Sequence, residues 1–264
     1  MSIHQSVKDN FMKFTALFEG GSQYDYMFLD SKGRVGTAYG IDLDFNGNGP
    51  SPSLALSRSQ GLPKAKELKW LVRGANPPRG ASDAEVTMEW ETMKALPWPH
   101  DATWYRPYAK LKLTDDSMKT AVIKKLGGNE WALKQNPAFQ NFDSWPADAQ
   151  LVVLGLSWNG PAWLLGNSAV TLLHPREFRE ACMNEDFNRA AEYSRMSVVD
   201  TNGSIFRRWK AQMIALQNAA IVVREEFLGN YQRSTLYWPG VLAPRLITTP
   251  PHPHLINRPG FPDN

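Results

Sequence analysis

Two carboxylates and one hydroxyl near the N-terminus are the side chains of this chain best suited to chemistry. Glu19 follows an apolar helical run, Asp30 ends a first short extended segment, and Thr37 lies in a second. Cleavage of a glycosidic bond needs one carboxyl group that protonates the leaving oxygen and a second that handles water or the developing positive charge. We therefore predict a hydrolytic site in which Glu19, Asp30 and Thr37 are the catalytic residues.

A helix and a hairpin would position these three side chains. The spacing of apolar residues predicts a helix over residues 5–19, which Gly20 and Gly21 are suited to end. Partial burial at the end of this helix would keep Glu19 protonated near neutral pH, so that it can act as an acid. The hairpin that follows is predicted to consist of strands at 26–29 and 34–39 and a turn at 31–33.

The order of these residues resembles the active-site signature of phage-type lysozymes. The matching pieces are Phe18-Glu19-Gly20, then Asp30 in FLDSKG, then VGTAYG. That family hydrolyses the linkage between N-acetylmuramic acid and N-acetylglucosamine in peptidoglycan. The resemblance implies that Glu19 is the general acid, that Asp30 and a hydroxyl orient the attacking water, and that no cofactor is needed.

The second strand departs from the family pattern. Gly36 occupies the family's Thr position, and Ile41 stands where a His is common. A shift of one residue reverses the face to which a strand side chain points. Either the strand bulges and Thr37 supplies the hydroxyl, or the hydroxyl is missing. Tyr39 on the same strand is predicted to contact the substrate.

Three later segments, in order, resemble a longer bacterial branch of lysozyme-like proteins. They are ASDAEVTMEWETMKA, PADAQLVVLGLSWNGPA and a long helix opened by Arg207 and Arg208. The resemblance implies that Asn159 and the two arginines contact peptidoglycan. The alternatives are a helix C-cap for Asn159 and a solvated helix face for the arginines. Members of this branch are often toxins delivered by type VI secretion, or phage-related wall hydrolases. An immunity protein and a secretion apparatus are therefore expected partners.

The expected fold is α+β, mainly α and lysozyme-like. One domain over 1–230 would hold a small hairpin lobe at about 20–60 and a helical lobe at about 62–230, followed by a Pro-rich tail at 231–264. The run from Leu151 to Trp158 is almost continuously apolar and predicts a central buried helix. Pro146 would open that central helix; the other predicted helices lie at 62–73, 82–96, 114–125 and 175–196, with a loop at 50–61 and irregular chain at 98–113.

The composition and the N-terminal sequence argue against several classes of protein. A net charge of +3 is too small to indicate nucleic-acid binding. A single cysteine, Cys182, cannot form an intrachain disulfide and is predicted to be buried. The N-terminus lacks the features of a signal peptide, and no apolar run is long enough to insert into a membrane. We expect a protein made in the cytoplasm that acts on peptidoglycan in the periplasm of a target cell after secretion.

Two local patterns have open interpretations. Asp42, Asp44 and Asn46 begin like a calcium loop, but Ser53 stands where the closing Glu belongs, so a plain loop is the alternative and no metal is predicted. The aromatic residues of the 98–113 stretch would either line a sugar groove or pack in the core: Trp98, Trp104, Tyr105 and Tyr108.

Two other functions remain open. The chain would be a catalytically silent peptidoglycan-binding protein if its site has been lost on a persisting fold. It would be a lytic transglycosylase if Glu19 alone carries the chemistry. Separately, the alternative for Asp30 is an ordinary turn residue whose side chain bonds its own backbone.

Overall fold

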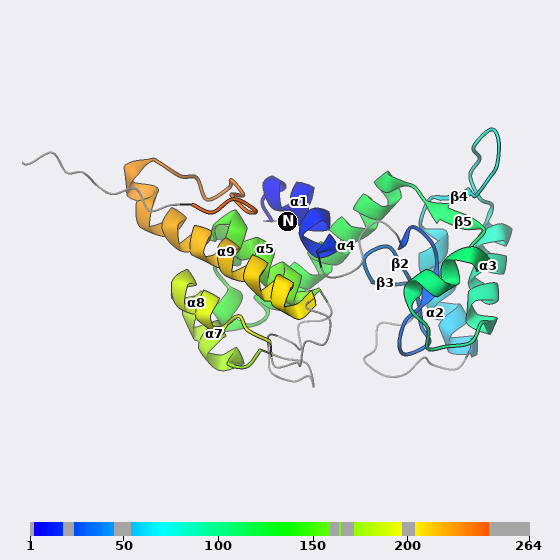
Figure 1. Cartoon of the computed structure of the whole chain (residues 1–264), viewed down its shortest axis with the longest axis horizontal. Helices are drawn as coiled ribbons and strands as arrows, with labels where there is room; N and C mark the ends of the chain where they lie inside the picture. Colours follow the sequence, from blue (N-terminus) through cyan, green and yellow to red (C-terminus); the bar gives the residue numbers. More distant parts are fainter. Residues whose placement is uncertain are drawn as a thin grey trace, which may run out of the picture.

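Helix α4 (Asp115–Lys134) runs between two groups of elements in this computed structural model (Figure 1). The β-strands, α2 and α3 lie at one end of α4, and helices α1, α5, α7, α8 and α9 lie at the other (Figure 1). The structure describes residues 3–17, 24–44, 54–158, 164, 172–196 and 204–242. Over these residues the fold is α+β and mainly α, with small antiparallel sheets, which confirms the predicted class.

The hairpin predicted near the N-terminus is present. Strands β1 (Phe28–Leu29), β2 (Val35–Thr37) and β3 (Ile41–Asp42) form an antiparallel meander. The turn between β1 and β2 closes with a bond from the Gly33 N–H to the Asp30 carbonyl at 2.9 Å. Gly33 has a φ of 71°, a conformation that favours glycine, and the Trp98 indole fills the space over it.

Helices and a second sheet complete this lobe. Strands β4 (Trp70–Val72) and β5 (Leu111–Leu113) pair across a long stretch of sequence. Helix α3 (Asp83–Ala95) begins with the predicted capping box, in which the Ser82 and Glu85 side chains bond each other's backbone N–H. Helix α3 packs against β1 and β2. The lobe that carries the hairpin therefore extends to β5, well beyond the predicted boundary near residue 60.

Two predictions in this lobe were wrong. Helix α2 (Leu54–Lys66) occupies part of the predicted loop at 50–61, and β4 replaces the second half of the helix predicted at 62–73. Trp70 is 3% exposed and pairs with Leu113, so distant pairing overrides the local helical pattern. The stretch predicted to be irregular contains the short 3₁₀-helix η2 (Ala102–Tyr108) before β5.

Helix α4 begins where predicted and ends later than predicted. The Thr114 side chain caps it by accepting a bond from the Ser117 N–H at 3.1 Å. The helix passes through the Gly127-Gly128 pair, where an end was expected. Two glycines cost about 1 kcal/mol each relative to alanine. Burial of Leu126 and Leu133 on one face of the helix offsets this cost.

Helix α5 (Ala147–Ser157) is the buried centre of the other lobe, as the apolar run predicted. All of its residues are buried, and α1 (Gln5–Ala16) and α9 (Ser204–Glu225) pack on it. At Gly155 an added Cβ would come within 2.7 Å of the Phe14 ring, so the glycine lets α1 approach closely. The remaining elements of this lobe are η3 (Pro137–Phe139), η4 (Phe142–Ser144), α7 (Pro175–Met183), α8 (Phe187–Tyr193) and η5 (Glu226–Leu228).

The helix predicted at 175–196 is broken into α7 and α8. Glu185 takes a φ of 52° at the break, and the Asp186 side chain accepts a bond from the Arg189 N–H to cap α8. The break lets both helices bury an apolar face, including Cys182, which is free and buried as predicted. In the described ranges no helix combines the length and apolar character needed to cross a membrane.

The first part of the predicted tail belongs to this lobe. Asp148 of α5 accepts bonds from the backbone N–H groups of Tyr237 and Trp238, both at 2.9 Å. The Asn218 side chain of α9 bonds Asp148 and the Gly240 carbonyl. Residues 231–242 are therefore held against α5 and α9, and residues 243–264 lie outside the described part of the chain.

The buried Asp148 carboxyl should give unfolding a specific pH dependence. Burial raises its pKa from 3.8 to about 6, against the opposing effect of the N–H groups that bond it. The folded state then holds the proton more tightly than the unfolded state, so this group's contribution is present below about pH 4 and is lost as pH rises to about 6. The expected loss is about 3 kcal/mol at about 1.4 kcal/mol per pKa unit.

Urea unfolding of the wild type and Asp148→Asn between pH 4 and 7 measures this effect. The free energy of unfolding of the wild type should fall relative to that of the variant as pH rises. The exposed Asp116→Asn is the control and should follow the wild type at every pH. A wild-type curve that stays parallel to the Asp148→Asn curve would contradict the prediction.

Candidate functional site

Asp30 lies at the end of β1, where the β1–β2 turn begins. Its Oδ1 accepts the backbone N–H groups of Lys32 at 2.8 Å and of Arg34 at 2.9 Å. Its Oδ2 accepts Nε and Nη2 of the Arg34 side chain at 2.8 and 2.7 Å. The Asp30 side chain remains 28% exposed. The hairpin thus holds this carboxylate rigidly while leaving one side of it open.

These four bonds match the acceptor capacity of the Asp30 carboxylate. An ionised carboxylate offers about four lone-pair sites. Two are used by the turn, which is the plain structural role that the sequence left open, and two by the Arg34 guanidinium. To orient a water molecule, Asp30 must give up one of these bonds. As it stands, the group is a fixed negative charge and not a free base.

Arg34 connects Asp30 to a wider network of charges. Its Nη1 lies 3.0 Å from Oδ2 of Asp42, so the guanidinium bridges two carboxylates. The Asp42 Oδ1 accepts the N–H of Asp44, and Asp44 pairs with Lys94 of α3 at 2.8 Å. Lys94 also donates to the Gly33 carbonyl in the turn. This chain of contacts fixes the hairpin, and Asp30 with it, against α3.

Replacing Arg34 should loosen the Asp30 carboxylate. Arg34→Gln removes the cation between Asp30 and Asp42, so both partly buried carboxylates lose their bonds to the guanidinium. We expect unfolding to become easier by about 1–3 kcal/mol. Arg34→Lys keeps the charge but not the two-pronged geometry of the guanidinium, so its stability should lie between those of the wild type and Arg34→Gln. Urea denaturation measures the change.

Arg79→Gln is the matched control, because Arg79 binds Glu85 through two nitrogens in the same way but lies on the surface, 54% exposed. It should change stability much less than Arg34→Gln. Equal effects of the two glutamine variants would show that the Arg34 network does not hold the hairpin.

The β2 strand does not bulge at Gly36. Phe28 pairs with Gly36 and Leu29 with Val35, while Gly36 pairs with Asp42 in the next strand. Side chains alternate between the two faces of a regular strand. A Cβ at Gly36 would lie 3.3 Å from the Phe28 ring, so this ring crowds the position at which the family carries Thr.

Thr37 belongs to the opposite, core-facing side of the hairpin. It pairs with Ile41 and shares its face with Leu29 and Val35, all of which are buried. Its side chain is 0% exposed, and its hydroxyl has no hydrogen-bond partner among the described residues. The register therefore turns the Thr37 hydroxyl away from the face of Phe28 and Asp42, which does not suit the predicted catalytic role.

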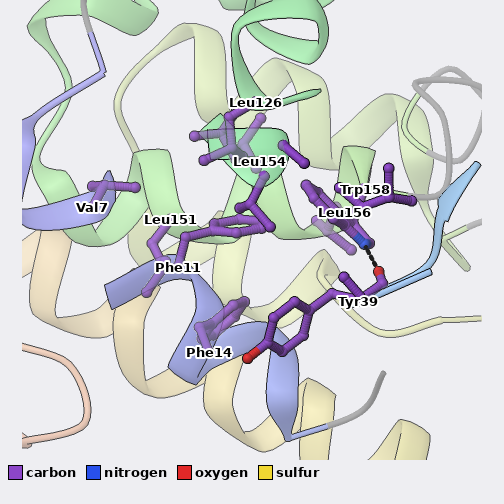
Figure 2. Close-up of a cluster of buried hydrophobic side chains, with 14 of the residues drawn as sticks. Val7, Phe11, Phe14, Tyr39, Leu126, Leu151, Leu154, Leu156 and Trp158 are labelled. Carbon is purple, nitrogen blue, oxygen red and sulfur yellow. Dashed lines mark hydrogen bonds between the residues drawn. The ribbon is translucent and has the colours of Figure 1, made fainter. Parts of the chain in front are cut away.

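Tyr39 lies in the core that joins the two lobes. Figure 2 shows its ring pointing toward Phe14 of α1, and Trp158 donating its indole N–H to the Tyr39 carbonyl, a bond of 2.6 Å. Tyr39 is 5% exposed, and burial, followed by the Asp115 charge, raises the pKa of its hydroxyl. Its side chain is placed for packing, which differs from the predicted contact with substrate.

The remaining predicted site residues divide into three groups. Arg207 is exposed on the first turns of α9. Arg208 is 4% exposed and donates through Nη2 to the Gly155 carbonyl at 2.5 Å, so it binds the end of α5 and is not open to a polymer. Glu19 and Asn159 lie outside the described residues, as does Asn46.

A pocket of about 590 Å³ opens beside Asp30. Residues 28–31 form one wall, and Pro99, His100, Asp101 and Ala102 form the other. His100 and Asp101 are not among the site residues predicted from the sequence. The signal that points to them is the unusual Trp, Tyr and Pro content of the surrounding stretch. The pocket is the place where the Asp30 carboxylate can meet a ligand.

The two described aspartates of the calcium-like loop are paired with cationic side chains of the protein. Asp42 binds Arg34 and Asp44 binds Lys94, so protein cations occupy the carboxylates that would face the metal. Throughout the part of the chain that the structure describes, no group of three or more His, Cys, Asp or Glu side chains is arranged to hold a metal ion.

No family model, curated protein or solved structure matches the chain.

Proposed function

We propose that this protein cleaves the glycan strands of peptidoglycan as a muramidase. The observation that carries the proposal is the Asp30 carboxylate, which the hairpin holds fixed and partly exposed beside a pocket. Asp30 follows Glu19 and precedes Thr37 in the sequence, which is the order that the lysozyme resemblance requires. The arrangement of a hairpin lobe and a helical lobe joined by α4, with α1 in the helical lobe, supports a lysozyme-like fold (Figure 1).

In the proposed reaction Glu19 donates a proton to the glycosidic oxygen as the bond to the muramic acid ring breaks. Asp30 provides the negative charge that stabilises the oxocarbenium-like transition state. Water attack assisted by Asp30 requires Arg34 to release one of its two bonds, and Asp42 is the adjacent carboxylate that keeps the guanidinium paired. Neither step needs a metal or an organic cofactor.

The filled acceptor sites of Asp30 favour a second candidate. A protein whose second carboxylate is fully bonded, and whose nearby hydroxyl faces the core, would suit a catalytically silent peptidoglycan-binding protein. The same observation is compatible with a lytic transglycosylase, which needs only the acid. Delivery into a rival cell, with an immunity protein as partner, rests on the resemblance alone.

Turbidity loss and product masses on purified peptidoglycan distinguish these functions. Reducing muramic acid ends released by the wild type, and not by Glu19→Gln, would support the muramidase. Anhydro sugars would identify a transglycosylase. The absence of products from a protein that still sediments with peptidoglycan would reject both activities and support the binding protein.

A further inference from the structure

Three rings lie in a row along η2, beside the pocket at Asp30. The His100 and Trp104 rings stack with their centroids 4.0 Å apart and an interplanar angle of 15°. Trp104 and Tyr108 follow at 4.9 Å. These two ring contacts place all three side chains next to one another. His100 is exposed, Tyr108 is 42% exposed, and nearby Trp98 is 52% exposed.

Two buried tyrosines hold this segment in place. The Tyr26 hydroxyl donates to the Ala102 carbonyl at 3.1 Å, and the Tyr105 hydroxyl donates to the Pro97 carbonyl at 3.0 Å. Both rings are fully buried, so the residues between these two anchors are tied to the core of the lobe. The pocket wall formed by His100 and Asp101 is therefore formed before a ligand arrives, which reduces the entropic cost of binding.

The polar groups of the pocket indicate the charge of its ligand. Asp30 and Asp101 both line it, and none of its lining residues is Lys or Arg. Asp101 stands at the start of η2 without a side-chain capping bond, so its exposed carboxylate can accept bonds from a ligand. The Arg34 charge behind Asp30 is already shared between two carboxylates. The pocket therefore disfavours phosphates and carboxylates and favours groups that donate hydrogen bonds.

We propose that this pocket and the His100–Trp104–Tyr108 row form a carbohydrate subsite that binds an uncharged N-acetylated sugar ring. Aromatic faces offer flat apolar surfaces to the C–H face of a pyranose, and the Asp101 carboxylate can accept bonds from its hydroxyl groups. Naming the ligand as a sugar of the peptidoglycan strand rests on the proposed function. The subsite is separate from the acid role of Glu19 and would extend the contact with the strand along the small lobe.

Isothermal titration of the Glu19→Gln variant with a tetrasaccharide of alternating N-acetylglucosamine and N-acetylmuramic acid tests the subsite without turnover. In that background, Trp104→Ala should weaken binding about tenfold or more, because it removes the ring that holds the His100 and Tyr108 rings in place. The surface variants Tyr108→Ala and Asp101→Asn should each weaken it several-fold while leaving the unfolding curve unchanged. They cover the case in which Trp104→Ala misfolds.

Trp131→Ala is the matched control, because Trp131 is 69% exposed on α4 and lies outside the pocket. It should bind like its parent. Unchanged binding in Tyr108→Ala and Asp101→Asn, or displacement of the sugar by 1,5-diaminopentane at equal concentration, would overturn the proposal; the latter result would identify an amine site.

The two proposals fail in different ways. Cleavage by the wild type with unchanged binding in the pocket variants would retain the muramidase and remove the subsite. If the wild type releases no products and the pocket variants lose sugar binding, the subsite would be retained and the muramidase activity rejected.

Discussion

Replacing Glu19 with glutamine is expected to lower the rate of glycan cleavage by about 10²- to 10⁴-fold, the contribution typical of a positioned general acid. Glutamine keeps the size of the side chain and one of its two oxygens but has no acidic proton for the leaving oxygen. The rate of release of reducing ends from purified peptidoglycan, at several protein concentrations, measures the effect. Binding to peptidoglycan should persist, because the pocket at Asp30 is untouched.

Glu67→Gln is the control for this substitution. Glu67 is 58% exposed and pairs with Lys124 on the surface at 2.6 Å. Its replacement removes one carboxylate of the same type without affecting the candidate site, and activity should remain that of the wild type. Equal activity in Glu19→Gln and Glu67→Gln would remove Glu19 from the reaction, and with it the role that the lysozyme resemblance implies.

Replacing Trp158 with alanine is expected to destabilise the protein by about 3–5 kcal/mol. Trp158 is 1% exposed at the end of α5, and its ring packs on Phe11 with centroids 5.0 Å apart. The Lys125 ammonium lies 4.1 Å from its ring centroid. Through the bond to the Tyr39 carbonyl, the same side chain ties the hairpin to the helical core (Figure 2).

Two variants separate the contributions of Trp158. Trp158→Phe keeps much of the apolar volume but leaves the buried Tyr39 carbonyl without its donor, which should cost about 1–3 kcal/mol. Trp131→Ala removes an exposed tryptophan from α4 and should stay within about 0.5 kcal/mol of the wild type. Urea denaturation at fixed pH compares the three. If Trp158→Ala were no less stable than Trp131→Ala, the contact between lobes would not contribute to folding.

The candidate site shows how far local sequence carries a functional prediction. The turn that holds Asp30 was predictable, because Gly33 and the Asp30 side chain satisfy it within five residues. The bridge from Arg34 to Asp42 was not, because it depends on how β3 folds back on β2. His100 and Asp101 were missed, since only tertiary packing brings their segment to the end of β1.

Features that depend only on neighbouring residues could be predicted from the sequence. The buried character of α5 follows from an unbroken apolar run, and the start of α3 follows from the reciprocal Ser82 and Glu85 bonds. Both depend on residues within a few positions of each other, so neither periodicity nor capping requires knowledge of the rest of the chain.

Features that depend on distant partners could not be predicted in this way, because they form only when the chain folds. Trp70 became a strand residue because Leu113 pairs with it. Tyr39 became a core residue because its ring points toward Phe14 of α1 and Trp158 bonds its carbonyl. Arg208 became buried because the end of α5 offers it a carbonyl. Thr37 faces the core because the β-register alternates without a bulge. In each case burial and pairing across the fold outweigh the local pattern, since they involve larger free energies than local propensity does.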